Sequence, residues 1–291
     1  TLGGRTFCER HYSSLAHNRK GMWGATLALI AGLVLFVLAV QYLARAVPVG
    51  LSGAGLLIVN FIIALAPAII WLVVFYLQDR VEPEPKSYIF LVFIGGALLA
   101  SAIGQPLIRD VFRVNEWASG NLALRLVGGI FVIGAIQEFL KYAAVRYTIF
   151  NSAEYDERID GIIYGAAAGL GYATMLNLDY VLANGGVDLG AGVVRVAVTA
   201  LAHASFAGVT GYFLGRAKFE NRGPLWLPLG VFIAALLNGI VTAIIGEITR
   251  SGLRTTPLNG LIGAAAVAVL TFGVLFAILQ RSNRTVPTTV A

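Results

Sequence analysis

Three ionisable side chains lie inside long apolar stretches of this chain, where they could do chemistry. Glu138 and Lys141 are three residues apart, so on a helix they share one face and can pair. His203 lies near the middle of a later apolar stretch. A carboxylate and an imidazole can bind a metal ion or move a proton. Because charged groups are costly inside a bilayer, those that persist there are candidates for a functional site.

Two amides and a guanidinium accompany these groups. Asn177 and Asn238 lie near the middle of two further apolar stretches. Arg195 and His203 are separated by two steps of four residues, which places them on one face of a helix. Since Asn177, His203, Asn238 and Glu138 fall at a similar depth of their stretches, we expect them to line one internal cavity.

Each of these residues also has a purely structural explanation. Glu138 and Lys141 could neutralise each other and fix how their helix packs. His203 could bind a metal, relay a proton or satisfy a buried partner. Asn177 could hydrogen-bond to a neighbouring helix, as asparagine does in other membrane proteins. Residue type and spacing leave these alternatives open.

The elements that position these residues are predicted to be membrane helices. Of the 291 residues, 58% are hydrophobic and 12% are charged, and the mean hydropathy is +0.80. Soluble domains carry about 25% charged residues, so most of this surface must face lipid. A β-barrel would show alternating segments of about ten residues, which the long unbroken apolar runs exclude. The sequence therefore predicts an all-α, polytopic membrane protein with about eight transmembrane helices.

Clusters of proline and charge separate the predicted helices and indicate how the chain is oriented. Most of the 21 Lys and Arg residues fall on the side that would hold both termini. This bias predicts a multi-pass protein of the plasma membrane with cytoplasmic termini. Residues 1–22 would be a cytoplasmic tail, 23–283 the transmembrane domain and 284–291 a second cytoplasmic tail. The expected spans are 23–45, 54–77, 88–108, 123–150, 160–183, 191–216, 225–246 and 259–280.

The formal net charge of +6 would suggest nucleic acid as a partner of a soluble protein. Here the cations fall mostly in the loops, so we expect the lipid bilayer as the partner and no nucleic acid. The N-terminal tail holds a Cys-x-x-His pair, Cys8 and His11. A structural zinc site needs four ligands, so this pair could be the end of a zinc-binding module that begins upstream of Thr1. The alternative is a basic tail held near anionic lipid headgroups.

Glycine recurs at four-residue steps in the fifth predicted span, at Gly161, Gly165 and Gly169. This spacing leaves a flat face on a helix, against which another backbone can approach closely. Tight helix packing is the expected role of these glycines.

Four short motifs follow one another between residues 79 and 215. They are a loop at 79–85 containing Glu-Pro-Glu-Pro, the run Gln-Glu-Phe-Leu-Lys-Tyr at 137–142, a glycine-rich stretch at 160–180 and a histidine helix at 203–215. In this order they resemble the PrsW family of intramembrane metalloproteases, which is related to the CAAX prenyl-protease group. The resemblance covers roughly residues 70 to 245. It implies a bacterial membrane hydrolase with a PrsW/CAAX-protease-like helical bundle.

The resemblance also implies a metal site, with zinc as the expected cofactor. Family members are understood to hold the metal with Glu and His side chains inside the membrane, which makes Glu138 and His203 the candidate metal ligands and catalytic residues. Lys141, Asn177 and Arg195 would support them. A zinc-bound water has a pKa of about 7, so that a carboxylate can take its proton.

This chain departs from the family pattern at three positions that bear on the metal. Gln137 stands where the family motif has its first Glu, Leu176 precedes Asn177 where a Glu is usual, and Asn238 replaces a His. Catalytic zinc takes about three protein ligands, and Glu138 and His203 supply two. Gln137 and Asn238 would keep the shape and hydrogen bonding of the site without its charge. The pattern favours an impaired protease or pseudoprotease.

Three functions remain in contention on the sequence alone. The first is a pseudoprotease that binds a membrane partner or serves as a subunit of a membrane assembly. The second is an active PrsW-type intramembrane metalloprotease that cleaves a membrane-anchored regulator. The third is a transporter or proton path, although internal repeats and broken helices typical of transporters are not evident.

Overall fold

The computed structural model describes residues 19–46, 53–77, 84–118, 120–183, 192–251 and 258–282, and these residues form helices joined by short turns, without strands. The predicted all-α class is therefore confirmed. The long helices are α2 (Arg19–Ala46), α3 (Gly53–Tyr76), α4 (Lys86–Leu99), α7 (Ala135–Thr148), α8 (Asp160–Ala183), α9 (Gly192–Phe219), α10 (Trp226–Ser251) and α11 (Leu258–Ser282).

Two of these helices continue through wider, π-helical turns. After α4 come η1 (Ala100–Gly104), η2 (Leu107–Val111) and the short α5 (Val114–Trp117). Before α7 the chain forms α6 (Leu122–Val127) and η3 (Gly128–Gly134). A π-turn adds a residue to the helical repeat and is often found at functional sites. The added residues change which side chains face the bundle interior.

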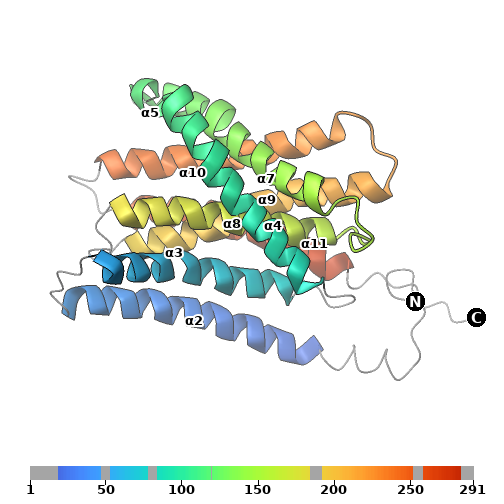
Figure 1. The fold of residues 1–291 in the computed structure, drawn as a ribbon, viewed down its shortest axis with the longest axis horizontal. Coiled ribbons are helices and arrows are strands. Elements are labelled where there is room, and N and C mark those ends of the chain that lie inside the picture. The colour runs from blue at the N-terminus through green and yellow to red at the C-terminus, as the bar shows by residue number, and fades with distance from the viewer. Residues whose placement is uncertain are drawn as a thin grey trace, which may run out of the picture.

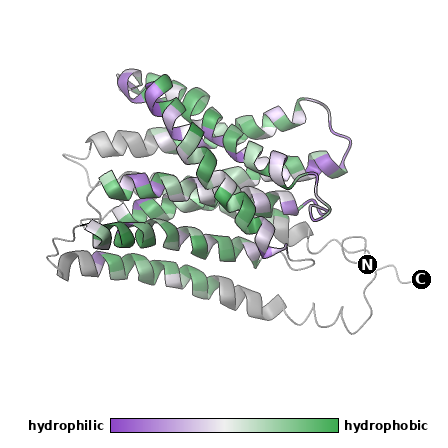
Figure 2. Cartoon of the chain, viewed as in Figure 1, coloured by the Kyte–Doolittle hydropathy of each residue, from purple (hydrophilic) through white to green (hydrophobic). Residues whose placement is uncertain are grey.

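Five helical segments of the described chain are long and apolar enough to cross a membrane. They are Gly53–Tyr76, Lys86–Trp117, Leu122–Thr148, Gly192–Phe219 and Trp226–Ala243. Leu27–Tyr42 and Ala265–Leu275 are shorter apolar helices. Apolar residues cover most of the described helices, whereas hydrophilic residues gather at their ends (Figure 2). The chain is thus a multi-pass membrane protein, and the count of eight crossing helices stays a prediction.

Helix α8 occupies the centre of the bundle, with α9, α3 and α4 around it (Figure 1). Small residues permit this crowding, because backbones approach α8 where side chains would otherwise lie. A Cβ atom on Gly171 would lie 1.8 Å from the Phe93 carbonyl oxygen of α4. A Cβ atom on Gly96 of α4 would lie 2.2 Å from the Ala168 carbonyl oxygen. Helix α8 is thereby locked against α4, as the glycine-rich sequence predicted for close helix contacts.

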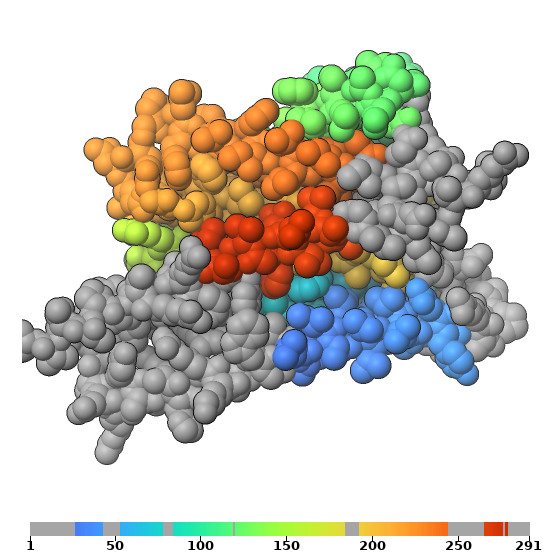
Figure 3. All heavy atoms as spheres, turned by 180° about the vertical axis from the view of Figure 1, so that it is seen from behind, coloured from blue at the N-terminus to red at the C-terminus, as the bar shows by residue number. Residues whose placement is uncertain are grey.

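Helix α11 closes the back of the bundle, where it lies between α10 and the pair α2 and α3 (Figure 3). Its Phe272 ring lies 5.5 Å from the rings of both Trp71 and Phe75 on α3. Leu275 of α11 contacts α9 beside Gly208, where an added Cβ would lie 2.8 Å from the Leu275 side chain. The last helix therefore holds α3 and α9 together.

A pair of buried carboxyl groups ties the turn before α4 to the start of α8. Glu84 is 4% exposed and accepts a hydrogen bond from the Tyr164 hydroxyl. Asp160, the first residue of α8, is 1% exposed, and its Oδ2 accepts a hydrogen bond from the Glu157 amide at 2.6 Å. Burial and the neighbouring Glu84 carboxyl raise the pKa of Asp160 to about 9.

This raised pKa predicts a stability that falls as the pH rises. The folded protein keeps the Asp160 proton up to about pH 9, whereas the unfolded chain loses it near 3.8, the ordinary pKa of an aspartate. The folded state therefore binds more protons between these values, and the free energy of unfolding decreases with pH across that interval. Thermal unfolding in detergent should show a lower Tm at pH 9 than at pH 6 in the wild type, and a smaller difference in Asp160→Asn.

The matched control is Glu154→Gln, which removes an exposed carboxylate from the same loop. It should keep the wild-type dependence of Tm on pH. An Asp160→Asn variant with the same pH dependence as the wild type would contradict the assignment of the proton to this pair.

Candidate functional site

Glu138, Lys141 and His203 meet in the interior between α7 and α9. Their side chains are buried, with residue exposures of 0%, 1% and 7%. Lys141 Nζ donates a hydrogen bond to Glu138 Oε1 and forms a buried ion pair with it. The same Nζ atom lies 3.1 Å from His203 Nδ1. The ammonium group of Lys141 therefore stands between the carboxylate and the imidazole, the two side chains predicted as metal ligands.

This contact bears on the tautomer of His203. With Lys141 as an ammonium group, which can only donate hydrogen bonds, His203 Nδ1 accepts from it and the ring proton lies on Nε2. Neither ring nitrogen retains a free lone pair in this arrangement. A metal ion bound by His203 would have to displace either Lys141 or that proton.

Two amides complete the surroundings of Glu138. Asn238 of α10 donates from Nδ2 to Glu138 Oε1 at 2.6 Å and to Gln137 Oε1 at 3.0 Å. Thr242 in turn donates to Asn238 Oδ1 at 3.2 Å. Among the described residues, the buried Glu138 Oε2 atom has no hydrogen-bond partner. The positions where the family pattern has Glu and His thus form a neutral hydrogen-bonded frame around one carboxylate.

Tyr172 of α8 joins this site, and the sequence reasoning missed it. Its ring stacks on His203 with centroids 6.0 Å apart and an interplanar angle of 12°. Lys141 Nζ lies 5.6 Å from the centre of the same ring, a cation–π distance. A signal was present, because Tyr172 precedes Leu176 by four residues and so shares its helix face.

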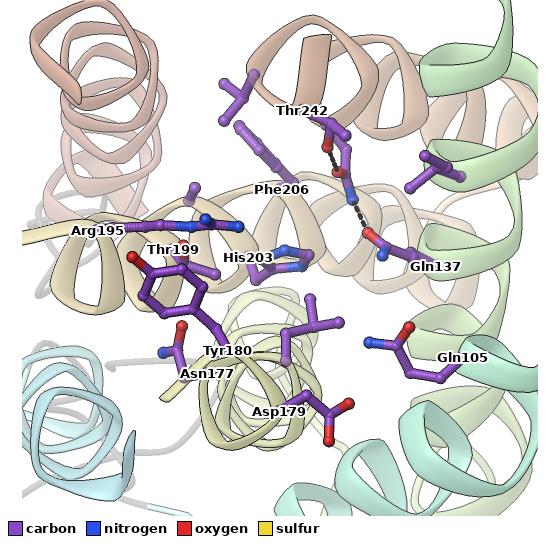
Figure 4. A pocket seen from close by; sticks show the side chains of 15 residues that line it. Gln105, Gln137, Asn177, Asp179, Tyr180, Arg195, Thr199, His203, Phe206 and Thr242 are labelled. Atoms are coloured by element: carbon purple, nitrogen blue, oxygen red, sulfur yellow. Dashed lines mark hydrogen bonds between the residues drawn. The ribbon is translucent and has the colours of Figure 1, made fainter. Parts of the chain in front are cut away.

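A cavity of about 540 Å³ opens beside these residues (Figure 4). Its lining side chains come from Gln105, from η3 and from α7, α8, α9 and α10. The expected convergence on one cavity is confirmed for Asn177, His203 and Asn238. It is not met by Glu138, whose side chain accepts a hydrogen bond from the lining residue Asn238. Gln105, which follows η1, was not anticipated although it is a polar residue in an apolar stretch. The lining residues are Gln105, Ile133, Gln137, Leu176, Asn177, Asp179, Tyr180, Arg195, Thr199, Ala202, His203, Phe206, Asn238, Val241 and Thr242.

The far end of the cavity lies where α8 ends and α9 begins. Arg195 places its guanidinium carbon 3.9 Å from the centre of the Tyr180 ring. Asn177 donates from Nδ2 to the Val196 carbonyl oxygen at 3.0 Å and so joins α8 to α9. Asp179 also lines this cavity. The cavity therefore has an amide and imidazole end and a guanidinium end.

The residues present do not fit a catalytic zinc ion in this arrangement. Such an ion takes about three protein ligands and an open position. In the part of the chain that the structure describes, no group of three or more His, Cys, Asp or Glu side chains could hold a metal ion. Leu176 and Asn238 offer no carboxylate or imidazole, and the Lys141 ammonium separates Glu138 from His203. Cys8 and His11, the candidate ligands in the tail, lie outside the described residues.

Comparison with known proteins agrees with the motifs. Residues 84–279 match the model of the PrsW family intramembrane metalloprotease. Protease PrsW of Halalkalibacterium halodurans is 32% identical over 183 residues, which cover 62% of this chain and 81% of the relative. Protease PrsW of Bacillus subtilis is 30% identical over 177 residues, covering 60% and 77%. No solved structure is significantly similar to the chain. The motifs, the membrane helices and the family match together show that this chain belongs to the PrsW family.

Proposed function

We propose that the chain is a catalytically impaired PrsW-family protein whose cavity binds a polypeptide partner within the membrane. The observation that carries this proposal is the position of Lys141. Its ammonium group pairs with Glu138 and contacts His203 Nδ1, so a fixed positive charge already stands where a metal ion would bridge the two. An ion of like charge is repelled from that position.

The cavity supports a binding role. It has a volume of about 540 Å³ and combines apolar side chains such as Phe206 and Val241 with amide groups of Gln105 and Asn177. Ligand sites are commonly concave and apolar with a few polar groups that fix orientation. A transmembrane segment with a polar residue would meet both requirements here. The same surface would serve if the protein were a subunit of a larger membrane assembly.

One observation favours an active metalloprotease as the second candidate. Glu138 Oε2 is buried and has no hydrogen-bond partner within the described part of the chain, whereas a buried carboxylate oxygen normally has one. The relatives that match the chain are named as proteases. On this alternative Glu138 and His203 would bind zinc or act as catalytic groups, and the substrate would be a membrane-anchored regulator.

The orientation and the divisions of the chain belong to the same proposal. We infer that both termini are cytoplasmic in the plasma membrane, with tails at 1–22 and 284–291 and the transmembrane domain at 23–283. The excess of Lys and Arg on one side supports this orientation.

Metal content tests the proposal directly. The protein purified in detergent is expected to hold no zinc that depends on His203, because Lys141 occupies the contact to Nδ1. Elemental analysis of the wild type, His203→Ala and Cys8→Ser measures this. Zinc that disappears only in Cys8→Ser would belong to the tail. One zinc per chain that is lost in His203→Ala would overturn the proposal and favour the protease.

A further inference from the structure

Arg195 brings a positive charge into the cavity without an acidic partner among the described residues. The ion pairs within that part of the chain do not include Arg195. Its guanidinium lies over the ring of Tyr180 and hydrogen-bonds with that side chain, contacts that orient the group but do not neutralise it. Arg195 is the fourth residue of α9 and lines the cavity, so its charge is available to a partner there.

The other charges around the cavity do not supply that partner. Asp179 lines the cavity and carries a carboxylate, but its electrostatic interaction is with Arg109 on η2. Figure 4 shows Asp179 beyond Tyr180, apart from Arg195, whose side chain runs toward His203 along α9. Glu138 is held by Lys141 and Asn238 at the opposite end. Arg195 therefore lines the cavity without an ion-pair partner among the described residues.

We propose that Arg195 binds a carboxylate of the polypeptide that occupies the cavity. A guanidinium presents a planar fork of donors that matches a carboxylate in a bidentate pair. A single cation suits a singly charged group such as a carboxylate. This inference rests on the proposed function, and it adds the chemical class of the partner: a membrane segment that carries an aspartate, a glutamate or a free C-terminus.

The spacing along α9 gives the register of that acidic residue. Arg195 and His203 are eight residues apart, which is a rise of about 12 Å along a helix. An extended peptide covers about 3.3 Å per residue. The carboxylate would thus lie roughly three or four residues from the part of the partner that contacts His203.

The test uses the full chain in nanodiscs of zwitterionic lipid. The probes are a dye-labelled, end-blocked six-residue peptide of leucine and alanine with one aspartate, and the same peptide with asparagine instead. Binding is measured by fluorescence anisotropy. The wild type is expected to bind the aspartate peptide about tenfold more tightly than the asparagine peptide, the ratio that corresponds to about 1.4 kcal/mol.

The variants isolate Arg195. In Arg195→Gln the ratio should fall to about one, and in Arg195→Lys it should be intermediate, since an ammonium keeps the charge but not the fork. The matched control is Arg113→Gln, which removes an exposed cation that pairs with Glu116, and it should keep the tenfold ratio.

The outcomes separate this inference from the proposed function. Equal binding of both peptides by the wild type would overturn the assignment of Arg195 and leave the binding role standing. If neither peptide binds, both the assignment and the binding role are overturned. A third outcome would assign the site to a lipid phosphate. In it, the wild type shows no preference for the aspartate peptide, and short-chain phosphatidylglycerol displaces both peptides, but less well in Arg195→Gln. The carboxylate assignment would then be wrong.

Discussion

Lys141→Met is expected to lower the free energy of unfolding by about 3–5 kcal/mol, the cost of leaving one member of a buried ion pair without the other. The pair of Lys141 and Glu138 is fully enclosed, with side-chain exposures of 0% on both sides. After the substitution Glu138 keeps the amide of Asn238 as a donor, but an amide does not neutralise a carboxylate. Unfolding titrations in detergent micelles measure the difference.

Two further variants show whether the pair or the volume of the lysine is responsible. Glu138→Gln combined with Lys141→Met removes both charges, and replacing a buried pair as a whole is often neutral or stabilising. This double variant should regain most of the lost stability. Arg109→Gln breaks an exposed pair with Asp110 and should cost less than about 1 kcal/mol.

A small effect of Lys141→Met would have a specific meaning. If the single variant loses less than about 1 kcal/mol, Glu138 is neutralised in another way, either by a proton or by a second cation. Elemental analysis of the variant separates the two, and a bound metal ion would contradict the proposal of an impaired site. The stability of one variant therefore bears on the same question as metal analysis, through a different readout.

The sequence predicted the class of the fold, because composition alone decides whether a surface faces lipid. The apolar stretches also coincide with the long helices: the expected spans 54–77 and 191–216 appear as α3 (Gly53–Tyr76) and α9 (Gly192–Phe219). Hydropathy could not say how these helices rotate about their axes. The glycine stripe that begins at Gly161 predicted a close helix contact, but not that α9 would be the partner.

The sequence predicted most residues of the site but not how their side chains are arranged. Glu138 and Lys141 pair as their three-residue spacing indicated. The contact between Lys141 and His203 depends on how α7 and α9 are rotated about their axes. The π-helical turn η3 before α7 changes the rotation of α7, and a regular helical repeat does not predict that change. The same reason explains Gln105, which lies between the π-turns η1 and η2.

Gly169→Ala is expected to destabilise the protein by about 3 kcal/mol, at the upper end of the cost of overpacking a core. A Cβ atom there would lie 2.3 Å from the His203 carbonyl oxygen and 2.9 Å from the Ala207 Cβ atom. Because the obstacle is backbone of α9, no side chain can rotate away, and the helices must separate. That separation would move His203 relative to Lys141, so the cavity should also change.

Gly273→Ala is the matched control for this effect, since Gly273 lies on α11 and no atom of the described residues would lie within 4 Å of an added Cβ atom. There the higher helix propensity of alanine should leave stability unchanged or raise it by up to about 1 kcal/mol. Unfolding in detergent measures both variants, and the fluorescence anisotropy of the dye-labelled aspartate peptide reports the cavity. Equal stability of Gly169→Ala and Gly273→Ala would mean that α8 and α9 do not approach as closely as described. The contact of His203 with Lys141, which requires that approach, would then lose its basis as well.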